Sequence, residues 1–116
     1  MSDVLQDHLK AVRDRFINLL DERLDELEDM RERIDQGTQR AEAFEKIQFI
    51  AHKIAGTAGI LGFEDLGSQA RIAENAIIEL GPKGLLETAD VDTLKKIDVF
   101  IETAAEISSR VYWENA

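Results

Sequence analysis

In this sequence of 116 residues, the side chain best suited to a chemical role is that of His52, one of two histidines. An imidazole that faces solvent serves as a metal ligand, a general base or a nucleophile. Apolar residues recur at helical spacing from Phe44 onward, and at about 100° per residue His52 falls opposite their stripe. We therefore expect the imidazole to lie on the outer face of a helix.

The residues that follow His52 are small. Positions 56–59 read Gly-Thr-Ala-Gly, although a glycine inside a helix costs about 1 kcal/mol relative to alanine. On the helical wheel Gly56 and Gly59 share the side of His52 with Gln48. We interpret this side as a surface kept clear for the close approach of a partner.

Metal binding and hydrolysis fit His52 poorly. The sequence has no cysteine, and no second histidine lies within helical reach. A di-iron bundle needs a glutamate three residues before each histidine, but Phe49 precedes His52 and Leu5 precedes His8 at that spacing. A hydrolytic site needs an enclosing pocket. We expect no metal and no cofactor, an ordinary exposed His8, and a nucleophilic His52 whose partner brings the catalytic groups.

Composition indicates an all-α protein, because the chain has one proline and is rich in alanine, leucine, glutamate and arginine. Its length fits a single domain over residues 1–116. The net charge of −10 disfavours nucleic acid as a partner. The polar N-terminus and the lack of 18 consecutive apolar residues predict no contact with a membrane and a cytoplasmic location.

Residues 4–36 contain neither glycine nor proline, which favours a long helical stretch. Their apolar positions form one run that ends at Leu19 and another that begins at Leu20, one residue out of phase. This shift predicts either two consecutive helices or one helix with a bend near Asp21.

The next predicted element is the central helix, which follows a stop at Gly37, takes Thr38 as its cap and runs to about Leu61. The remaining predicted elements are a turn at Gly62, a helix from Glu64 or Asp65 to about Leu80, a break at residues 81–84, a loop from Leu85 to Asp90, and a helix capped by Asp90 that runs from Val91 to about Tyr112. Together they predict an antiparallel four-helix bundle with an additional N-terminal helix.

The central helix and the helix after it form an antiparallel hairpin around Gly62. Glu74 lies about 12 residues after this turn and His52 about 10 residues before it, so the two reach comparable heights. A carboxylate that accepts a hydrogen bond from Nδ1 would fix the imidazole tautomer and leave Nε2 as the nucleophile. The spacing permits this contact.

Residues 52–63, HKIAGTAGILGF, resemble the signature of histidine-containing phosphotransfer (HPt) domains. In that signature a histidine is followed by a run of small residues, with one glycine four residues later and another ten residues later. The pairs Ala58-Gly59 and Gly62-Phe63, with Leu66 and Glu74-Asn75 further on, are especially similar to the phosphotransfer domain of chemotaxis histidine kinases. The specific match spans about 25 residues.

The resemblance implies a free-standing phosphotransfer protein of a two-component phosphorelay. His52 would exchange a phosphoryl group with an aspartate of a response-regulator receiver domain, in a pathway fed by a sensor or hybrid histidine kinase, and Glu74 would orient the imidazole. The partner would supply Mg²⁺ and the catalytic groups, so the chain would be a phosphocarrier rather than an enzyme. HPt domains commonly carry a lysine three residues after the histidine, where this chain has Ala55; Lys53 is the nearest cation along the helix.

Phe49 and Ile60 flank His52 on the wheel and lie away from the core stripe. The predicted partner-binding surface comprises Gln48, Phe49, Lys53, Gly56, Gly59 and Ile60. In the alternative, Phe49 packs in the core as an ordinary apolar residue. We expect a monomer. Two other functions stay open: a docking module for a kinase or receiver that is never phosphorylated, favoured by Ala55, and a structural bundle that dimerises through its N-terminal helices.

Overall fold

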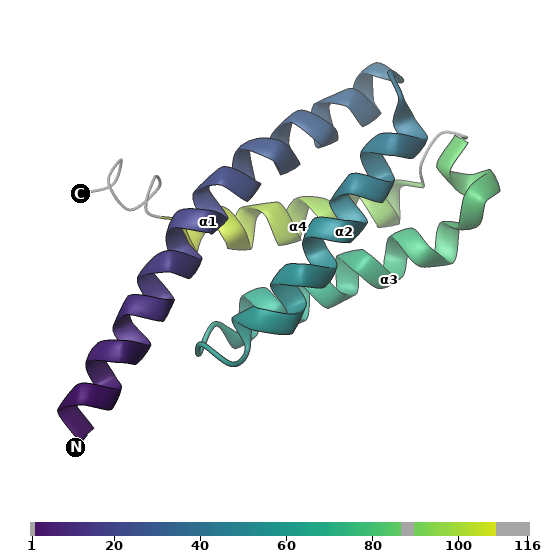
Figure 1. The fold of residues 1–116 in the computed structure, drawn as a ribbon. Helices are drawn as coiled ribbons and strands as arrows, with labels where there is room; N and C mark the ends of the chain where they lie inside the picture. The colour runs from purple at the N-terminus through teal and green to yellow at the C-terminus, as the bar shows by residue number, and fades with distance from the viewer. Residues whose placement is uncertain (1, 87–89, 109–116) are drawn as a thin grey trace.

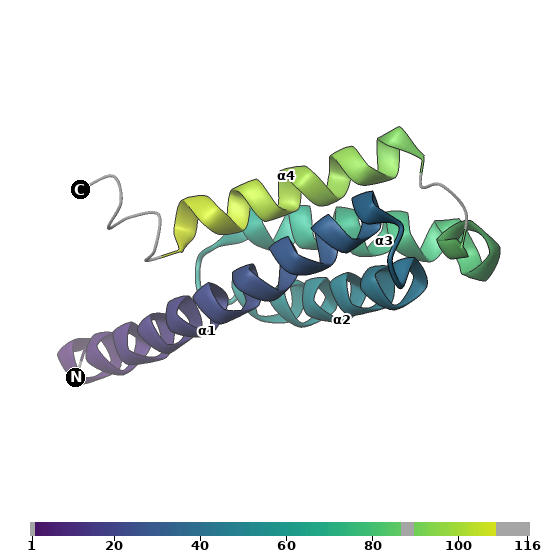
Figure 2. The same ribbon diagram turned by 90° about the horizontal axis from the view of Figure 1, so that it is seen from above.

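The computed structural model describes residues 2–86 and 90–108, which form four helices: α1 (Ser2–Gln36), α2 (Arg40–Ala58), α3 (Glu64–Leu86) and α4 (Val91–Ile107). Figure 1 and Figure 2 show them in an up-and-down bundle, in which each helix runs antiparallel to the next and α4 returns beside α1. The described residues contain no strand. The predicted all-α fold with a four-helix bundle is confirmed.

Each helix contributes one apolar stripe to a shared core. The stripe predicted for the central helix is buried throughout, and it consists of Phe44, Ile47, Ile50, Ala51, Ile54, Ala58 and Leu61. Burying one large aliphatic or aromatic side chain contributes about 1.5–3 kcal/mol, so this stripe determines which face of α2 turns inward. His52 lies between stripe positions and is left on the outer face.

The additional N-terminal helix is not a separate element, because α1 is one helix of 35 residues. Of the two predicted arrangements, the structure has the single helix, whose axis curves in Figure 1. The predicted phase shift was wrong because Leu19 is 46 % exposed and belongs to no buried stripe. The buried stripe passes from Phe16 directly to Leu20 and then to Leu24 at unbroken helical spacing. Residues 3–11 are exposed and extend beyond the other helices.

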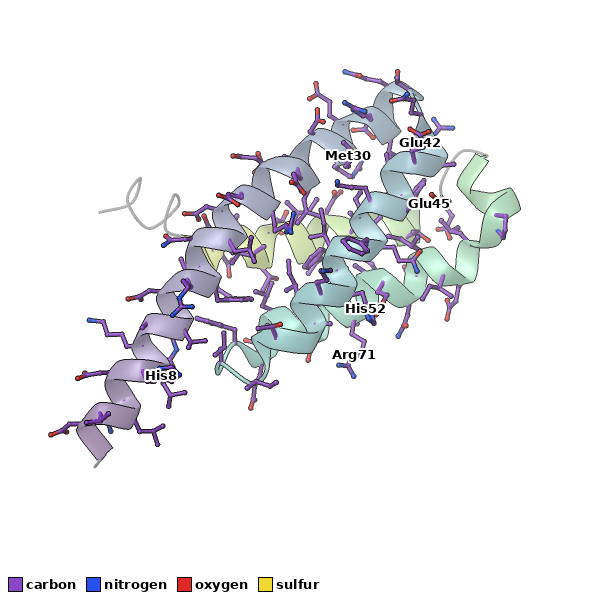
Figure 3. The ribbon with its side chains drawn as sticks, in the orientation of Figure 1. His8, Met30, Glu42, Glu45, His52 and Arg71 are labelled. Atoms are coloured by element: carbon purple, nitrogen blue, oxygen red, sulfur yellow. The ribbon has the colours of Figure 1, made fainter. Side chains whose placement is uncertain are left out.

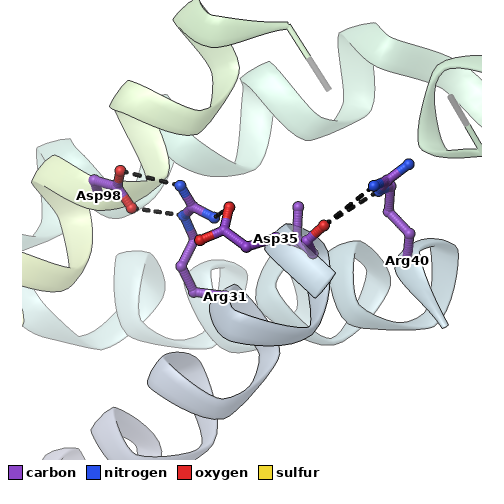
Figure 4. Close-up of polar contacts among 5 residues, drawn as sticks. Arg31, Asp35, Arg40 and Asp98 are labelled. Atoms are coloured by element: carbon purple, nitrogen blue, oxygen red, sulfur yellow. Dashed lines mark hydrogen bonds and ion pairs between the residues drawn. The ribbon is translucent and has the colours of Figure 1, made fainter. Parts of the chain in front are cut away.

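The connection between α1 and α2 is closed by backbone and side-chain hydrogen bonds. Gly37 has a φ of 71°, and its N–H donates to the carbonyl of Ile34. The Arg40 guanidinium also donates to that carbonyl (Figure 4). The predicted stop at Gly37 is confirmed, but Thr38 is not the cap. Gln39 occupies the N-cap position in a left-handed conformation, without a capping side-chain hydrogen bond.

The later helix boundaries differ from the prediction in three places. α2 ends at Ala58 rather than near Leu61, because residues 59–62 form a turn in which Gly62 has a φ of 90°. The predicted break at residues 81–84 is a kink within α3, located at Gly81 with a φ of 67°. Asp90 caps α4 as predicted, since its carboxylate accepts from two backbone N–H groups. Leu85 and Leu86, predicted as the start of a loop, belong to α3 instead. The predicted loop residues 87–89 and the predicted helix end near Tyr112 lie outside the described residues.

Side chains of α1 hold the turn between α2 and α3. The Arg13 Nε donates to the carbonyl of Leu61 at 3.2 Å. The rings of Phe16 and Phe63 stack with their centroids 5.5 Å apart. Because both contacts reach the turn itself, they set the position of the α2–α3 hairpin relative to α1.

Polar contacts also fix the register between α1 and α4. Arg31 donates to Asp98 of α4 at 2.7 Å and to Asp35 of its own helix at 2.6 Å (Figure 4). Burial acts to lower the pKa of Arg31, but the hydrogen bonds to the two carboxylates outweigh burial and raise that pKa above its ordinary value. At the other end of α4, the Ser108 hydroxyl donates to Asp21. These contacts lie on the side of the bundle opposite His52.

Candidate functional site

His52 and Glu74 form a contact between α2 and α3. The Nδ1 atom of His52 lies 2.6 Å from Oε2 of Glu74. The histidine side chain is 74 % exposed and that of Glu74 is 14 % exposed, and Figure 3 shows His52 on the outer face of α2. A carboxylate only accepts hydrogen bonds, so Nδ1 carries the ring proton and Nε2 keeps its lone pair. Because Nδ1 is turned toward α3, Nε2 is presented to solvent.

This contact follows from the packing of α2 against α3. A Cβ atom at Gly67 of α3 would lie 3.5 Å from the backbone nitrogen of Gly59 and 3.7 Å from the Cβ of Ala58. The absence of a side chain at Gly67 therefore allows the two helices to approach closely at this level. In an antiparallel pair, seven residues back from Gly59 and seven residues forward from Gly67 lead to His52 and Glu74. The sequence-based expectation that these two residues reach the same height agrees with this register.

Two of the other predicted surface residues lie next to the imidazole. Gln48 and Phe49 line a shallow hollow together with Glu45, His52 and Glu74. Phe49 is 54 % exposed, so the alternative in which it packs in the core is wrong. The ammonium of Lys53 lies 4.9 Å from the centroid of the Phe49 ring, within the range of a cation–π interaction.

The two glycines of the predicted surface face open space. A Cβ atom at either Gly56 or Gly59 would meet no other atom within 4 Å. Ile60 is 84 % exposed. The wheel extended the helix past Ile60, whereas α2 ends at Ala58. Ile60 lies in the following turn, displaced by eight residues or about 12 Å along the helix direction.

Sequence reasoning missed a groove between α2 and α3, with a volume of about 600 Å³. Its lining includes Ala55, Gly67, Ser68, Arg71 and Asn75. A usable signal was present in the sequence. Once Glu74 is placed opposite His52, a step of three residues toward the turn on each helix places Arg71 opposite Ala55.

The family model for the Hpt domain matches residues 12–107. The chain belongs to the Hpt domain family. Hpt domains are histidine phosphotransfer modules of phosphorelays, and they are phosphocarriers rather than classical enzymes. Membership therefore implies interaction with two-component kinases and receiver domains. The resemblance based on residues 52–63 is confirmed at the level of the family. No curated protein and no solved structure gives a significant match.

The matched range of this Hpt domain contains all of α2 and extends through Ile107, the last residue of α4, so it includes both His52 and Glu74. It omits residues 2–11 of α1, nearly all of which lie in the exposed extension beyond the bundle. The family match thus covers the part of the chain that forms the core and the candidate site.

Residues 2–86 and 90–108 of this Hpt domain hold neither a metal cluster nor a membrane-spanning helix. No group of three histidine, aspartate or glutamate side chains is arranged there to hold a metal ion. None of the helices in the same ranges combines the length and the apolar character that crossing a membrane requires.

Proposed function

We propose that this Hpt domain carries a phosphoryl group on Nε2 of His52 and exchanges it with the aspartate of a response-regulator receiver domain. A sensor or hybrid histidine kinase is the source of phosphoryl groups in the pathway. The observation that supports the proposal most strongly is the 2.6 Å contact between Glu74 and Nδ1 of an imidazole that is 74 % exposed. It combines a defined tautomer with a nucleophilic nitrogen that a partner can reach.

The contact with Glu74 also supports the transfer step itself. When the Nε2 lone pair attacks phosphorus, the P–O bond to the receiver aspartate breaks and an N–P bond forms. The Nδ1 proton stays on the ring, so positive charge develops on the imidazole during attack. The carboxylate of Glu74, 2.6 Å from Nδ1, stabilises this charge where it develops. The reverse step returns the phosphoryl group to an aspartate and restores the neutral ring.

The remaining catalytic groups belong to the partner in this proposal. Transfer of a phosphoryl group requires positive charge around its oxygens, which receiver domains provide as Mg²⁺ and a lysine. The sequence contains no glycine-rich phosphate-binding loop. We propose a free-standing phosphocarrier in which residues 1–116 act as one domain and a separate kinase supplies the phosphoryl group.

We propose that the receiver docks around His52 on Gln48, Phe49, Lys53, Gly56 and Gly59. The open space above both glycines supports this surface, because a partner backbone can approach there without meeting a side chain. An exposed phenylalanine beside polar residues is a common feature of association surfaces. Ile60 lies at the far rim and contributes only if the interface extends to the turn between α2 and α3.

The test is transfer from purified receiver domains whose aspartate has been phosphorylated with radiolabelled phosphate. The wild-type chain and His8→Gln should acquire a label that acid removes and base does not, as expected of phosphohistidine. His52→Gln should acquire none while its circular dichroism spectrum remains that of the wild type.

Two results would contradict the proposal. One is full labelling of His52→Gln. The other is stable binding of a receiver or kinase with no label transferred to the wild-type chain, which is the behaviour of a docking module. Measuring binding and labelling on the same samples separates these results.

A further inference from the structure

A phosphoryl group on His52 would enter an acidic environment. Phosphoryl groups on protein side chains carry a charge between about −1.5 and −2 at neutral pH. Glu74 and Glu45 both line the hollow that contains the imidazole, and the chain has a net charge of −10. Between partner encounters, when no receiver lysine or Mg²⁺ is present, a cation supplied by this chain would stabilise the phosphorylated state.

Lys53 is poorly placed to be that cation. Its ammonium lies over the Phe49 ring. Its side chain lines the groove between α1 and α2 together with Phe16 and Leu20. Lys53 therefore occupies the α1 side of the imidazole, whereas Glu74 and the Nδ1 hydrogen bond lie on the α3 side.

Arg71 is placed on the α3 side, one turn from Glu74. Three residues along a helix correspond to about 4.5 Å, a distance that the long arginine side chain can span. In the view of Figure 3, Arg71 and His52 both lie on the α2–α3 side of the bundle. Arg71 is exposed. In contrast to Arg31, it makes no hydrogen bond or ion pair to any residue in the ranges that the structure describes.

The groove in front of Arg71 is open because two of the residues that line it, one on α2 and one on α3, are small. Ala55 and Gly67 line this groove and present a methyl group and a hydrogen atom where larger side chains would fill it. Ala55 stands three residues after His52, so the space begins one turn from the imidazole. Glu64 also lines the groove, but it forms no ion pair with Arg71 within the described part of the chain.

From these placements, and resting on the proposed function of His52, we propose that Arg71 binds the phosphoryl oxygens of phosphorylated His52. The guanidinium would reach across the groove above Ala55 and donate two N–H bonds to the oxygens, since its planar fork matches that geometry. Arg71 would be a phosphoryl-binding residue contributed by α3, on the helix that also carries Glu74. Its role would be to stabilise the charged phosphorylated state before a receiver arrives.

Phosphoramidate is a suitable probe because it phosphorylates imidazoles without a partner protein. Its P–N bond breaks, ammonia leaves and the new N–P bond forms at the imidazole. Wild type, Arg71→Gln and Arg71→Lys are compared at low ionic strength, with Lys95→Gln as a control that removes one positive charge from the exposed surface of α4. The rate of labelling and the ³¹P chemical shift of the product are followed by NMR, the latter as a function of pH.

Arg71→Gln should label about threefold to tenfold more slowly than wild type, and the apparent pKa of its phosphoryl group should rise by about half a unit or more. The direction follows because a nearby cation favours the more negative form of the phosphoryl group. Arg71→Lys should recover part of both effects, and Lys95→Gln should match wild type. Salt should diminish the differences.

Equal labelling rates and identical ³¹P titrations for wild type and Arg71→Gln would overturn the inference about Arg71 while leaving phosphorylation of His52 intact. If the wild-type chain gives no phosphohistidine signal at all, with phosphoramidate or with a phosphorylated receiver, the proposed function fails instead. The two failures are thus distinguished in the same set of samples.

Discussion

The two sides of the bundle use their polar side chains in different ways. On the α1–α4 side, Arg31 is half-buried and donates to both Asp98 and Asp35. On the α2–α3 side, Arg71 is exposed without such partners in the described residues, and the imidazole of His52 uses one nitrogen and leaves the other free. Polar groups satisfied within the chain hold helices together, whereas groups left open are available to a ligand or partner.

The glycines show the same division. Gly67 is buried at a close approach of α3 to the backbone of α2. Gly56 is exposed, with open space around the position of a Cβ atom. One glycine is required by packing inside the molecule, and the other carries a helix-propensity cost that packing does not explain. The following predictions test whether stability and phosphotransfer divide between these regions as the contacts suggest.

The largest expected loss of stability comes from the core beneath α1. Leu24 is fully buried, so Leu24→Ala should lower the free energy of unfolding by about 2–5 kcal/mol through lost burial and the cavity left behind. Urea denaturation followed by circular dichroism measures this change. His52→Gln, as the matched change at the site, should stay within about 0.5 kcal/mol of wild type. Similar unfolding midpoints for Leu24→Ala and His52→Gln would contradict the division of the molecule into a region that provides stability and a region that carries out phosphotransfer.

A smaller loss is expected at the helix contact that positions Glu74. Gly67→Leu would force a large side chain against the backbone of α2 and should cost about 1–3 kcal/mol. Gly56→Leu should leave stability unchanged or raise it by up to about 1 kcal/mol, because leucine is the better helix former and meets no obstacle. Thermal unfolding of the pair gives the comparison. A greater loss at Gly56 than at Gly67 would mean that the packing has been misassigned.

The ion pairs between α1 and α4 should have a smaller effect still. Arg31→Met removes hydrogen bonds to partly exposed carboxylates, so we expect a loss of about 1 kcal/mol. Arg71→Met should change the unfolding free energy by less than about 0.5 kcal/mol. The phosphorylation rate should respond in the opposite order: Arg71→Met should slow phosphorylation more than Arg31→Met does. If Arg71→Met proved less stable than Arg31→Met, Arg71 would instead be one of the residues that hold the helices together.

For Glu74→Ala we expect the unfolding free energy to stay within about 1 kcal/mol of wild type, because the contact partner is exposed. Its phosphorylation by a receiver should nevertheless slow by about tenfold or more, since a charge-assisted hydrogen bond of about 1.5 kcal/mol to the reacting ring is lost. Quench-flow labelling provides the rate. An unchanged rate would show that Glu74 does not assist the transfer.

Much of the fold was predictable because helical periodicity and breaker residues act locally. The stripe from Phe44 to Ala58 and the turn at Gly62 follow from spacing and from the need for a positive φ. The match in height between His52 and Glu74 follows from counting residues on either side of that turn. Local sequence carried enough information because both helices of the hairpin are regular and the link between them is short.

Other features depend on tertiary contacts that periodicity does not contain. Leu19 is apolar but 46 % exposed, so counting it as a core residue led to two consecutive helices as one of the two predicted arrangements of α1. The early end of α2 moved Ile60 off the helical face that the wheel assumed. Arg71 has no distinctive motif around it, and its position opposite Ala55 follows only after Glu74 has been placed opposite His52.

The central claim is that Glu74 holds the imidazole so that Nε2 of His52 receives the phosphoryl group. The most direct test is NMR of the phosphorylated chain with ¹⁵N-labelled histidine, in which couplings to phosphorus identify the modified nitrogen. The account predicts a single phosphohistidine, His52, modified at Nε2 with the proton retained on Nδ1. Phosphorylation at Nδ1 of His52, or at His8, would contradict it.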